Sequence, residues 1–253
     1  MMGSGRRLGA SGSADDDDLL ALFAAIDSGA DGEVARLLDQ SPGLATRPAR
    51  IGATRQDPEP YFLRAIRHYV YAGDTALHVA AAAHNRPLAE AVVARGAEVR
   101  ARNRRGAEPI HYAADGSPAA INGEPDGQYE VITYLIEAGA DPDAKDNSGV
   151  AAIHRAVRTR SSNAVSALIE KGADPRLMNG SGSTPLHLAV QNTGKAGSGS
   201  GPAKDEQRRI IALLLGHGAR PTDVDANGKT VAAAASSDWI RQLLDNSRRN
   251  DRG

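Results

Sequence analysis

One six-residue phrase occurs four times along the chain: Thr75-Ala-Leu-His-Val-Ala, Glu108-Pro-Ile-His-Tyr-Ala, Ala151-Ala-Ile-His-Arg-Ala and Thr184-Pro-Leu-His-Leu-Ala. The copies begin 33, 43 and 33 residues apart, which indicates a unit of about 33 residues with a 10-residue insertion in one copy. A degenerate fifth copy begins at Thr230, 46 residues after the fourth, and indicates a second insertion of 13 residues. Such a period decides the architecture, because each unit buries its apolar side against the next unit.

A Gly-Ala pair closes an apolar run in each unit, at Gly29, Gly96, Gly139, Gly172 and Gly218. Thr or Pro at the start of the phrase suits the first turn of a short helix. The apolar spacing in Val131, Ile132 and Leu135 then predicts a second helix. The glycine supplies the left-handed residue that ends this helix, so we predict positive φ at Gly139 and Gly172.

The period, the phrase and the Gly-Ala pair together resemble the ankyrin repeat family. The resemblance implies an all-α fold, a solenoid of stacked helix-turn-helix units with short β-hairpin-like turns and about six repeats including caps. It covers residues 19–246. The predicted segments are a disordered tail (1–18), an N-terminal cap (19–40), an irregular segment (41–72), four repeats (73–105, 106–148, 149–181 and 182–227), a C-terminal cap (228–246) and a tail (247–253).

Composition and charge narrow the classes of function. The 253 residues carry a formal net charge of −1, which gives no reason to expect nucleic acid or another anionic polymer as a partner. The absence of cysteine excludes disulfides and thiolate metal sites. No stretch resembles a signal peptide or a membrane span. We therefore expect a cytoplasmic protein without a cofactor, and its oligomeric state stays open.

The four histidines of the phrase, His78, His111, His154 and His187, suggest a metal site at first sight. Successive copies belong to successive layers, and packed helices lie about 8–10 Å apart. Zinc ligands must reach one point at about 2.0–2.1 Å, so these histidines do not share an ion. The family resemblance implies instead that each histidine makes local hydrogen bonds at the start of its helix.

Arginines gather in two places, in Arg100-Ala-Arg-Asn-Arg-Arg105 and in Arg155-Ala-Val-Arg158-Thr-Arg160. The resemblance implies that the turn tips and the positions just after the phrase line a concave surface. The binding residues predicted from this placement are Tyr71, Arg104, Arg105, Asp115, Arg155, Arg158, Arg160, Gln191 and Asn192. The alternative is a solvated face, with acidic neighbours such as Glu98, Glu108 and Asp146 neutralising the arginines and the stem of Arg155 packed.

Two hypotheses for the function follow. The leading one is a protein–protein interaction module that binds an acidic or carboxylate-bearing segment in its concave groove, since arginine binds carboxylates at two points. The alternative is a small-molecule or enzymatic site for an anionic substrate under the inserted loops at 115–127 and 193–205. That site would use His68, Tyr69, Tyr71, Arg104, Arg105, Asp115, Arg158 and Arg160. The sequence contains no nucleophile with an identifiable base and no nucleotide fingerprint, so we expect no enzyme.

Overall fold

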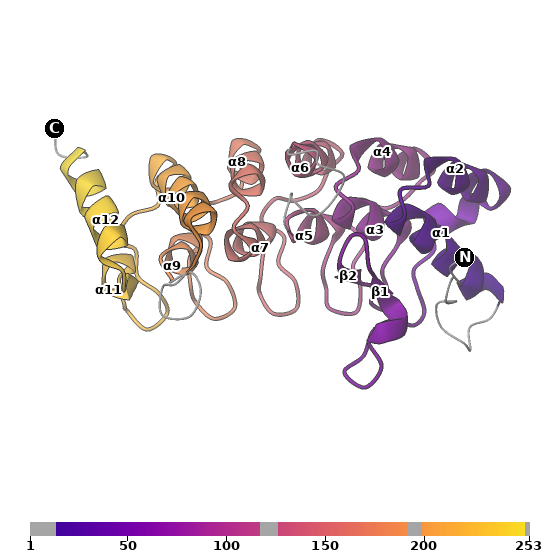
Figure 1. Cartoon of the computed structure of the whole chain (residues 1–253), viewed down its shortest axis with the longest axis horizontal. Coiled ribbons are helices and arrows are strands. Elements are labelled where there is room, and N and C mark those ends of the chain that lie inside the picture. The colour runs from indigo at the N-terminus through magenta and orange to yellow at the C-terminus, as the bar shows by residue number, and fades with distance from the viewer. Residues whose placement is uncertain (1–13, 117–125, 192–198, 251–253) are drawn as a thin grey trace. The chain divides into compact units, whose positions relative to one another are not determined.

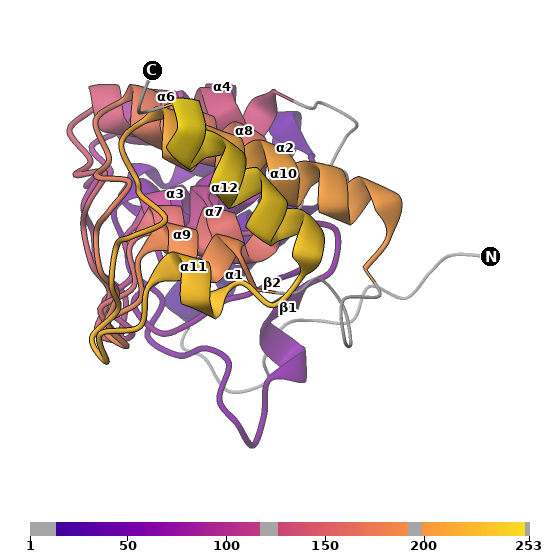
Figure 2. The ribbon, with the colours of Figure 1, turned by 90° about the vertical axis from the view of Figure 1, so that its left-hand side faces the viewer.

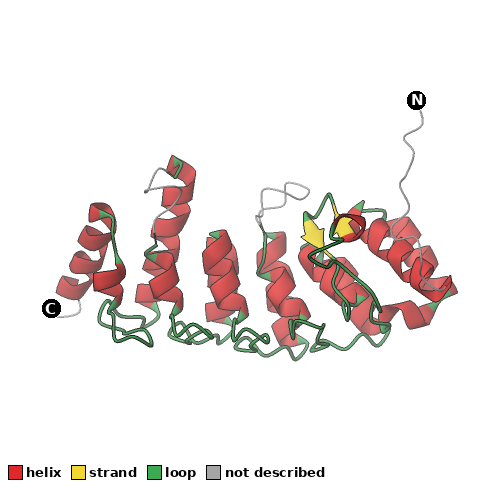
Figure 3. Ribbon diagram, turned by 90° about the horizontal axis from the view of Figure 1, so that it is seen from below, coloured by secondary structure: helices red, strands yellow, loops and turns green. Residues whose placement is uncertain are grey.

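The computed structural model describes residues 14–116, 126–191 and 199–250. The chain divides into two units, the first made of Met1–Ala113 and Pro118–Ala140 and the second of Ala114–Ser117 and Asp141–Gly253. Each described part consists mostly of paired helices (Figure 1). The turns of the second unit, green in Figure 3, lie along one edge of its helix pairs. The predicted all-α repeat fold is thus confirmed.

The described residues of the first unit form six α-helices, two 3-10 turns and one small sheet. Its helices and 3-10 turns are α1 (Ala14–Asp27), α2 (Asp31–Gln40), η1 (Pro42–Ala45), η2 (Glu59–Tyr61), α3 (Ala76–Ala82), α4 (Arg86–Ala94), α5 (Pro109–Ala113) and α6 (Gly127–Glu137). Strands β1 (Phe62–Leu63) and β2 (His68–Tyr69) pair antiparallel, with Phe62 opposite Tyr69. The irregular segment is tied to α1, because the Asp27 carboxylate accepts the backbone N–H groups of Arg64, Ala65 and Ile66 at 2.9–3.1 Å.

The residues described in the second unit form three helix pairs. They are α7 (Ala152–Thr159) with α8 (Ser162–Glu170), α9 (Pro185–Ala189) with α10 (Gly201–Gly216), and α11 (Val231–Ala234) with α12 (Asp238–Asn250). Helix α10, orange in Figure 2, has 16 residues, whereas α8 has 9. Isolated bridges between Lys145 and Ala151 and between Val224 and Thr230 close two of the turns, as expected of hairpin-like connections.

The phrase histidine fixes the start of the first helix in the four repeats that contain it. In α3 the backbone N–H of Thr75 donates to Nδ1 of His78 (3.1 Å), and the same contact joins Ala151 to His154 (3.2 Å). Because Nδ1 accepts, the proton of the neutral ring is on Nε2. Nε2 of His78 donates to the Ala107 carbonyl (3.1 Å) and that of His154 to the Leu177 carbonyl (2.9 Å). The implied local role is confirmed, and each ring also joins its helix to the following turn.

The Gly-Ala pairs end the second helices as predicted. Gly139 has φ of 108° and Gly172 has φ of 99°. A residue with a Cβ atom resists this left-handed region, particularly a β-branched one. The N–H of each following alanine bonds back into the helix, from Ala140 to the Leu135 carbonyl and from Ala173 to the Leu168 carbonyl (both 2.9 Å).

The two repeats that carry an insertion make the same hydrogen bond between their helices as the other repeats, but with a different donor. In every repeat a donor that lies 11 residues before the Gly-Ala glycine bonds a carbonyl near the end of the first helix. The four pairs are Asn85 N to Ala80 O (3.3 Å), Ser161 N to Ala156 O (3.0 Å), Gln128 Nε2 to Ala113 O (2.9 Å) and Gln207 Nε2 to Ala189 O (2.6 Å). A buried glutamine amide therefore replaces the backbone N–H wherever an insertion separates the two helices.

Several predicted boundaries differ from the observed ones. Helix α1 begins at Ala14, not at residue 19, because Asp16, Asp17 and Asp18 in its first turns complement the positive end of the helix. Helix α12 continues to Asn250, past the predicted end at 246. The loop predicted over 193–205 is already helical from Gly201, where Ser200 caps α10. The remaining parts of both tails and both inserted loops (1–13, 117–125, 192–198 and 251–253) lie outside the described residues.

Candidate functional site

In the first unit, two predicted site arginines lie against one predicted site tyrosine. The guanidinium carbon of Arg105 is 4.6 Å from the centre of the Tyr71 ring, and that of Arg104 is 5.6 Å from it. The Arg104 guanidinium also donates to the Ala53 carbonyl. Both arginines are exposed, and Tyr71 is half-buried. We call Tyr71, Arg104 and Arg105 the Arg–Tyr cluster.

A buried polar network lies beneath the Arg–Tyr cluster. The Tyr112 hydroxyl donates to the Asp74 carboxylate (2.8 and 2.9 Å), and the Asn103 amide donates both to Asp74 (2.8 Å) and to the Tyr112 oxygen (2.8 Å). Asp74, Asn103 and Tyr112 are 0%, 5% and 2% exposed. Buried polar groups that satisfy one another hold a single arrangement, because every alternative leaves one of them without a partner. We call these three residues the Asp74 network.

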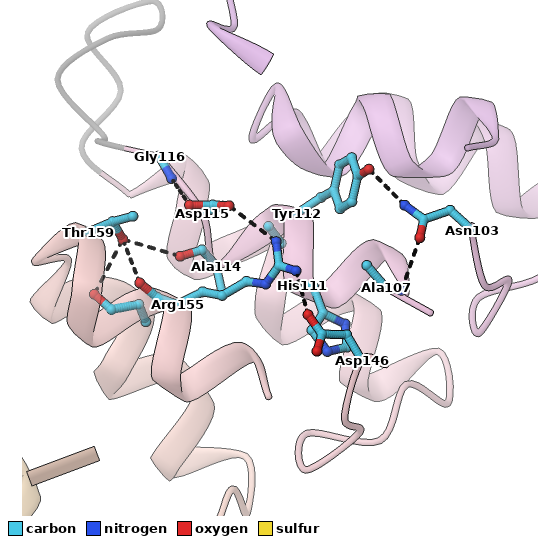
Figure 4. A network of polar contacts seen from close by, with 12 residues as sticks. Asn103, Ala107, His111, Tyr112, Ala114, Asp115, Gly116, Asp146, Arg155 and Thr159 are labelled. Atoms are coloured by element: carbon cyan, nitrogen blue, oxygen red, sulfur yellow. Dashed lines mark hydrogen bonds and ion pairs between the residues drawn. The ribbon is translucent and has the colours of Figure 1, made fainter. Parts of the chain in front are cut away.

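The Asp74 network positions both halves of the cluster. Asp74 Oδ2 accepts the backbone N–H of Tyr71 (2.6 Å), which fixes the chain that carries the ring. Asn103 Oδ1 accepts the N–H groups of Arg105 (2.9 Å) and Ala107 (3.1 Å), which fixes the turn that carries the arginines. The contacts of Asn103 with Ala107 and Tyr112 appear at the right of Figure 4. The cluster thus rests on buried side chains rather than on a loose loop.

The backbone approaches closely where the two halves meet. The Arg104 N–H donates to the Ala72 carbonyl (2.8 Å), and Gly73 has φ of 90°. A Cβ at Gly73 would lie 2.7 Å from the Asn103 Cα, so no side chain fits there. Glycine at this position therefore permits the contact on which the Arg–Tyr cluster depends.

In the second unit, Arg155 meets two carboxylates. One guanidinium nitrogen is 3.2 Å from Asp115 and the other is 2.8 Å from Asp146 (Figure 4). Asp146 also accepts the N–H groups of Ser148 (2.8 Å) and Val150 (3.0 Å). Burial acts to raise the pKa of Asp146, but these hydrogen bonds outweigh it and hold the pKa below its ordinary value. Two predicted site residues, Asp115 and Arg155, are thus partners of each other.

The other predicted site residues of the second unit have different surroundings. Arg158 is exposed in the last turn of α7. Arg160 is the left-handed cap of that helix (φ 61°), and burial lowers the pKa of its half-buried guanidinium. The Gln191 carbonyl accepts the Gln207 amide at 2.7 Å. Asn192 lies outside the described residues.

The structure brings the predicted residues together in separate groups. Tyr71, Arg104 and Arg105 belong to the first unit, and the predicted residues from Asp115 to Gln191 belong to the second. One groove that contains both groups stays a prediction. In the alternative site, the His68 ring packs at a tilt against Tyr112 (4.3 Å between ring centres), and the Tyr69 ring packs at a tilt against Phe62 (4.6 Å). Among the described residues, no group of three His, Asp or Glu side chains could hold a metal ion.

The comparisons with known proteins agree on one family. Models of ankyrin repeats match residues 22–146, 119–198 and 181–228. The chain belongs to the ankyrin repeat family. Ankyrin repeats generally mediate protein–protein interactions, and proteins built from them are typically binding modules without enzymatic activity. No curated protein matches the sequence.

No helix in the described part of this ankyrin repeat chain is long and apolar enough to cross a bilayer. Its cytoplasmic location stays a prediction. The sequence reasoning also missed three positioning residues, Asp74, Asn103 and Tyr112. Tyr112 carried a usable signal, because it occupies the phrase position at which two sister repeats have the apolar residues Val79 and Leu188. A tyrosine buried there needs a partner for its hydroxyl.

Proposed function

We propose that this ankyrin repeat protein binds an acidic segment of a partner protein at the Arg–Tyr cluster. The observation that supports the proposal is the placement of two guanidinium groups on one tyrosine ring, 4.6 and 5.6 Å from its centre. Arginine presents its donors as a planar fork that matches a carboxylate. Two such forks from adjacent residues suit neighbouring acidic side chains of one peptide.

Preorganisation, more than the ion pairs themselves, supplies the affinity in this proposal. An exposed ion pair contributes only about 0.2–1 kcal/mol. An arginine side chain carries about 2 kcal/mol of rotamer entropy, which a free side chain loses when it is fixed on binding. Contact with Tyr71 restricts both arginines before the partner arrives, and the Asp74 network fixes the backbone under them. The ordering cost is therefore reduced, and this is how a rigid site gains affinity.

The proposal extends, as a second step, to Arg158 and Arg160 in the second unit. A longer acidic segment that reaches both groups would gain affinity from the linkage of two weak contacts. Arg160 suits this role because burial already disfavours its charged form, as its lowered pKa shows. A carboxylate brought to it would relieve that cost.

The test uses a fluorescein-labelled peptide of alternating Glu and Gly, with fluorescence anisotropy as the measurement. Replacing Arg104 and Arg105 by Gln should weaken binding at least about tenfold, and added salt should weaken binding to the unmodified chain. The matched control replaces Arg64 and Arg67 by Gln, which removes the same charge from the same unit. If the control variant loses as much affinity, net charge alone explains binding and the site assignment is wrong.

The second step has its own variant. Replacing Arg158 and Arg160 by Gln should weaken binding of a long acidic peptide and leave that of a short one unchanged. Equal affinities of this variant and the unmodified chain for peptides of every length would confine the site to the first unit.

A further inference from the structure

The turns of the second unit expose two large apolar side chains. Met178 is 40% exposed and Val224 is 43% exposed, and they are the large apolar residues classed as exposed among those that the structure describes. They occupy the same position of successive turns, six residues after the Gly-Ala glycine, where earlier turns carry Arg102 and Lys145. An apolar residue at a place that other repeats fill with a cation calls for an explanation beyond folding.

The two side chains line one pocket with a volume of about 480 Å³. Its walls come from the turn before α9 and the turn before α11. The walls are joined, because the Ala226 N–H donates to the Gly182 carbonyl at 3.0 Å. Gly182 has φ of 75°, and a Cβ there would lie 2.1 Å from that of Ala226. The spacing of the walls is therefore fixed before anything binds.

The charged side chains beside the pocket are two arginines and two aspartates, Arg176, Arg220, Asp174 and Asp223. The buried Asp223 accepts the Arg176 guanidinium (2.8 Å) and the Arg220 backbone N–H (2.7 Å). Asp174 accepts the Arg176 backbone N–H (2.8 Å). The exposed Arg220 guanidinium makes no ion pair with any residue that the structure describes. Asp174 has no ion pair among the described residues either, but it accepts the Arg176 backbone N–H, so the Arg220 guanidinium is the charged group of the lining that keeps all its hydrogen-bond donors unused there. Covering the pocket thus buries apolar surface next to this guanidinium.

We propose that this turn pocket receives one large apolar side chain of a bound protein, next to a carboxylate that pairs with Arg220. A protein side chain fits better than a free small molecule, because small-molecule sites bury most of their ligand. Here Met178 and Val224 stay about two-fifths exposed, as suits a chain that lies across the turns. The turn pocket shares no residue with the Arg–Tyr cluster, so this proposal does not rest on the acidic-segment proposal.

Methionine supplies a direct reporter. The chain has three methionines, Met1, Met2 and Met178, so a ¹³C label on the methionine methyl groups places one signal in the pocket. The probe is the acetylated hexapeptide amide Gly-Ser-Leu-Glu-Ser-Gly. We expect it to shift the Met178 methyl signal saturably. A Leu-to-Ser probe should bind at least about tenfold more weakly, in line with the burial of one leucine side chain. A Glu-to-Gln probe should bind about two- to fivefold more weakly, in line with one exposed ion pair.

Protein variants complete the test. Val224→Lys should weaken binding of the hexapeptide at least about tenfold. The variant protein should still fold, because Lys145 occupies the same position of a sister turn. Arg220→Gln should abolish the difference between the Glu and Gln probes. The Arg104→Gln/Arg105→Gln variant should give the same Met178 shift as the unmodified chain, which separates this proposal from the previous one. The proposal is wrong if the Ser probe shifts Met178 equally, or if dilution alone moves the signal, since that would identify a second copy as the occupant.

Discussion

The fifth position of the phrase differs between the two units in an instructive way. It holds Tyr112 in the first unit and Arg155 in the second, where sister repeats have Val79 and Leu188. The Tyr112 hydroxyl donates to the buried Asp74 carboxylate, which accepts hydrogen bonds from uncharged donors. Arg155, in contrast, lies between two carboxylates. The location of the carboxylates, and not the number of arginines, thus decides which arginines are structural.

One turn position makes the comparison sharper. Asn103 and Asp146 occupy the same place, and the Oδ1 atom of each accepts two backbone N–H groups of its turn. The other side-chain atom differs in kind. Asn103 Nδ2 donates to Asp74, whereas Asp146 Oδ2 accepts from Arg155. Exchanging the two residue types therefore breaks one network at a time and leaves both turns intact.

The largest effect is expected for Asn103→Asp. The new carboxylate would face Asp74, whose Oδ1 is 2.8 Å from the present amide nitrogen, and two hydrogen bonds would be lost. Unfolding by urea at pH 7 should show a loss of about 3 kcal/mol or more. Two carboxylates at one site raise the pKa of one of them. The folded pKa is then above the unfolded one, so the loss should shrink as pH falls. A loss independent of pH would mean that the carboxylates do not meet.

The reverse exchange, Asp146→Asn, should cost about 1–3 kcal/mol. Asparagine can keep the two turn hydrogen bonds, as Asn179 does in the next repeat at 3.0 Å. Arg155, only 18% exposed, would retain Asp115 and lose its shorter contact. Binding of the acidic peptide should not change. A stability equal to that of the unmodified chain would show that the ion pair with Asp146 contributes nothing net.

The sequence predicted the repeat, the helix starts and the glycine ends because these depend on residues within one unit. His78 and Thr75, for example, are three positions apart. The Asp74 network joins residues up to 38 positions apart, and Arg155 meets Asp115 across 40 positions. Such partners are set by how side chains of successive repeats pack, and a period does not show this. The pairing of Tyr71, Arg104 and Arg105 was predictable as a group, but the buried residues that hold it were not.

A smaller effect on the free energy of unfolding is expected when the buried histidines His78 and His154, one in each unit, are protonated at low pH. Burial lowers the pKa of both His78 and His154 below the ordinary value. The unfolded chain, with a histidine pKa near 6.5, therefore takes up protons first as pH falls. The stability from each neutral ring is complete above about pH 6.5 and is lost as pH falls toward the folded pKa, by at most about 1.4 kcal/mol per pH unit for each histidine.

NMR titration of the histidine ring protons measures both pKa values directly. Asp74 acts to raise the pKa of His78, and Lys145 acts to lower that of His154, so the two units give separate readings. Midpoints of His78 and His154 that coincide with the unfolded value would contradict the assignment of neutral, buried rings.

The smallest effect is expected for Arg155→Leu combined with Asp146→Asn, which gives this repeat the residues that Leu188 and Asn179 place in the next one. The double change removes both partners of the shorter ion pair, and the new asparagine can keep the two turn hydrogen bonds as Asn179 does. Replacing both partners of a buried ion pair by uncharged side chains is often neutral, whereas removing one partner alone strands a buried charge. The free energy of unfolding should therefore change by less than about 1 kcal/mol, and binding of the acidic peptide should be unchanged. Loss of peptide binding with stability intact would show that Arg155 contacts the partner. The distinction between a structural arginine in the second unit and binding arginines in the first would then be wrong.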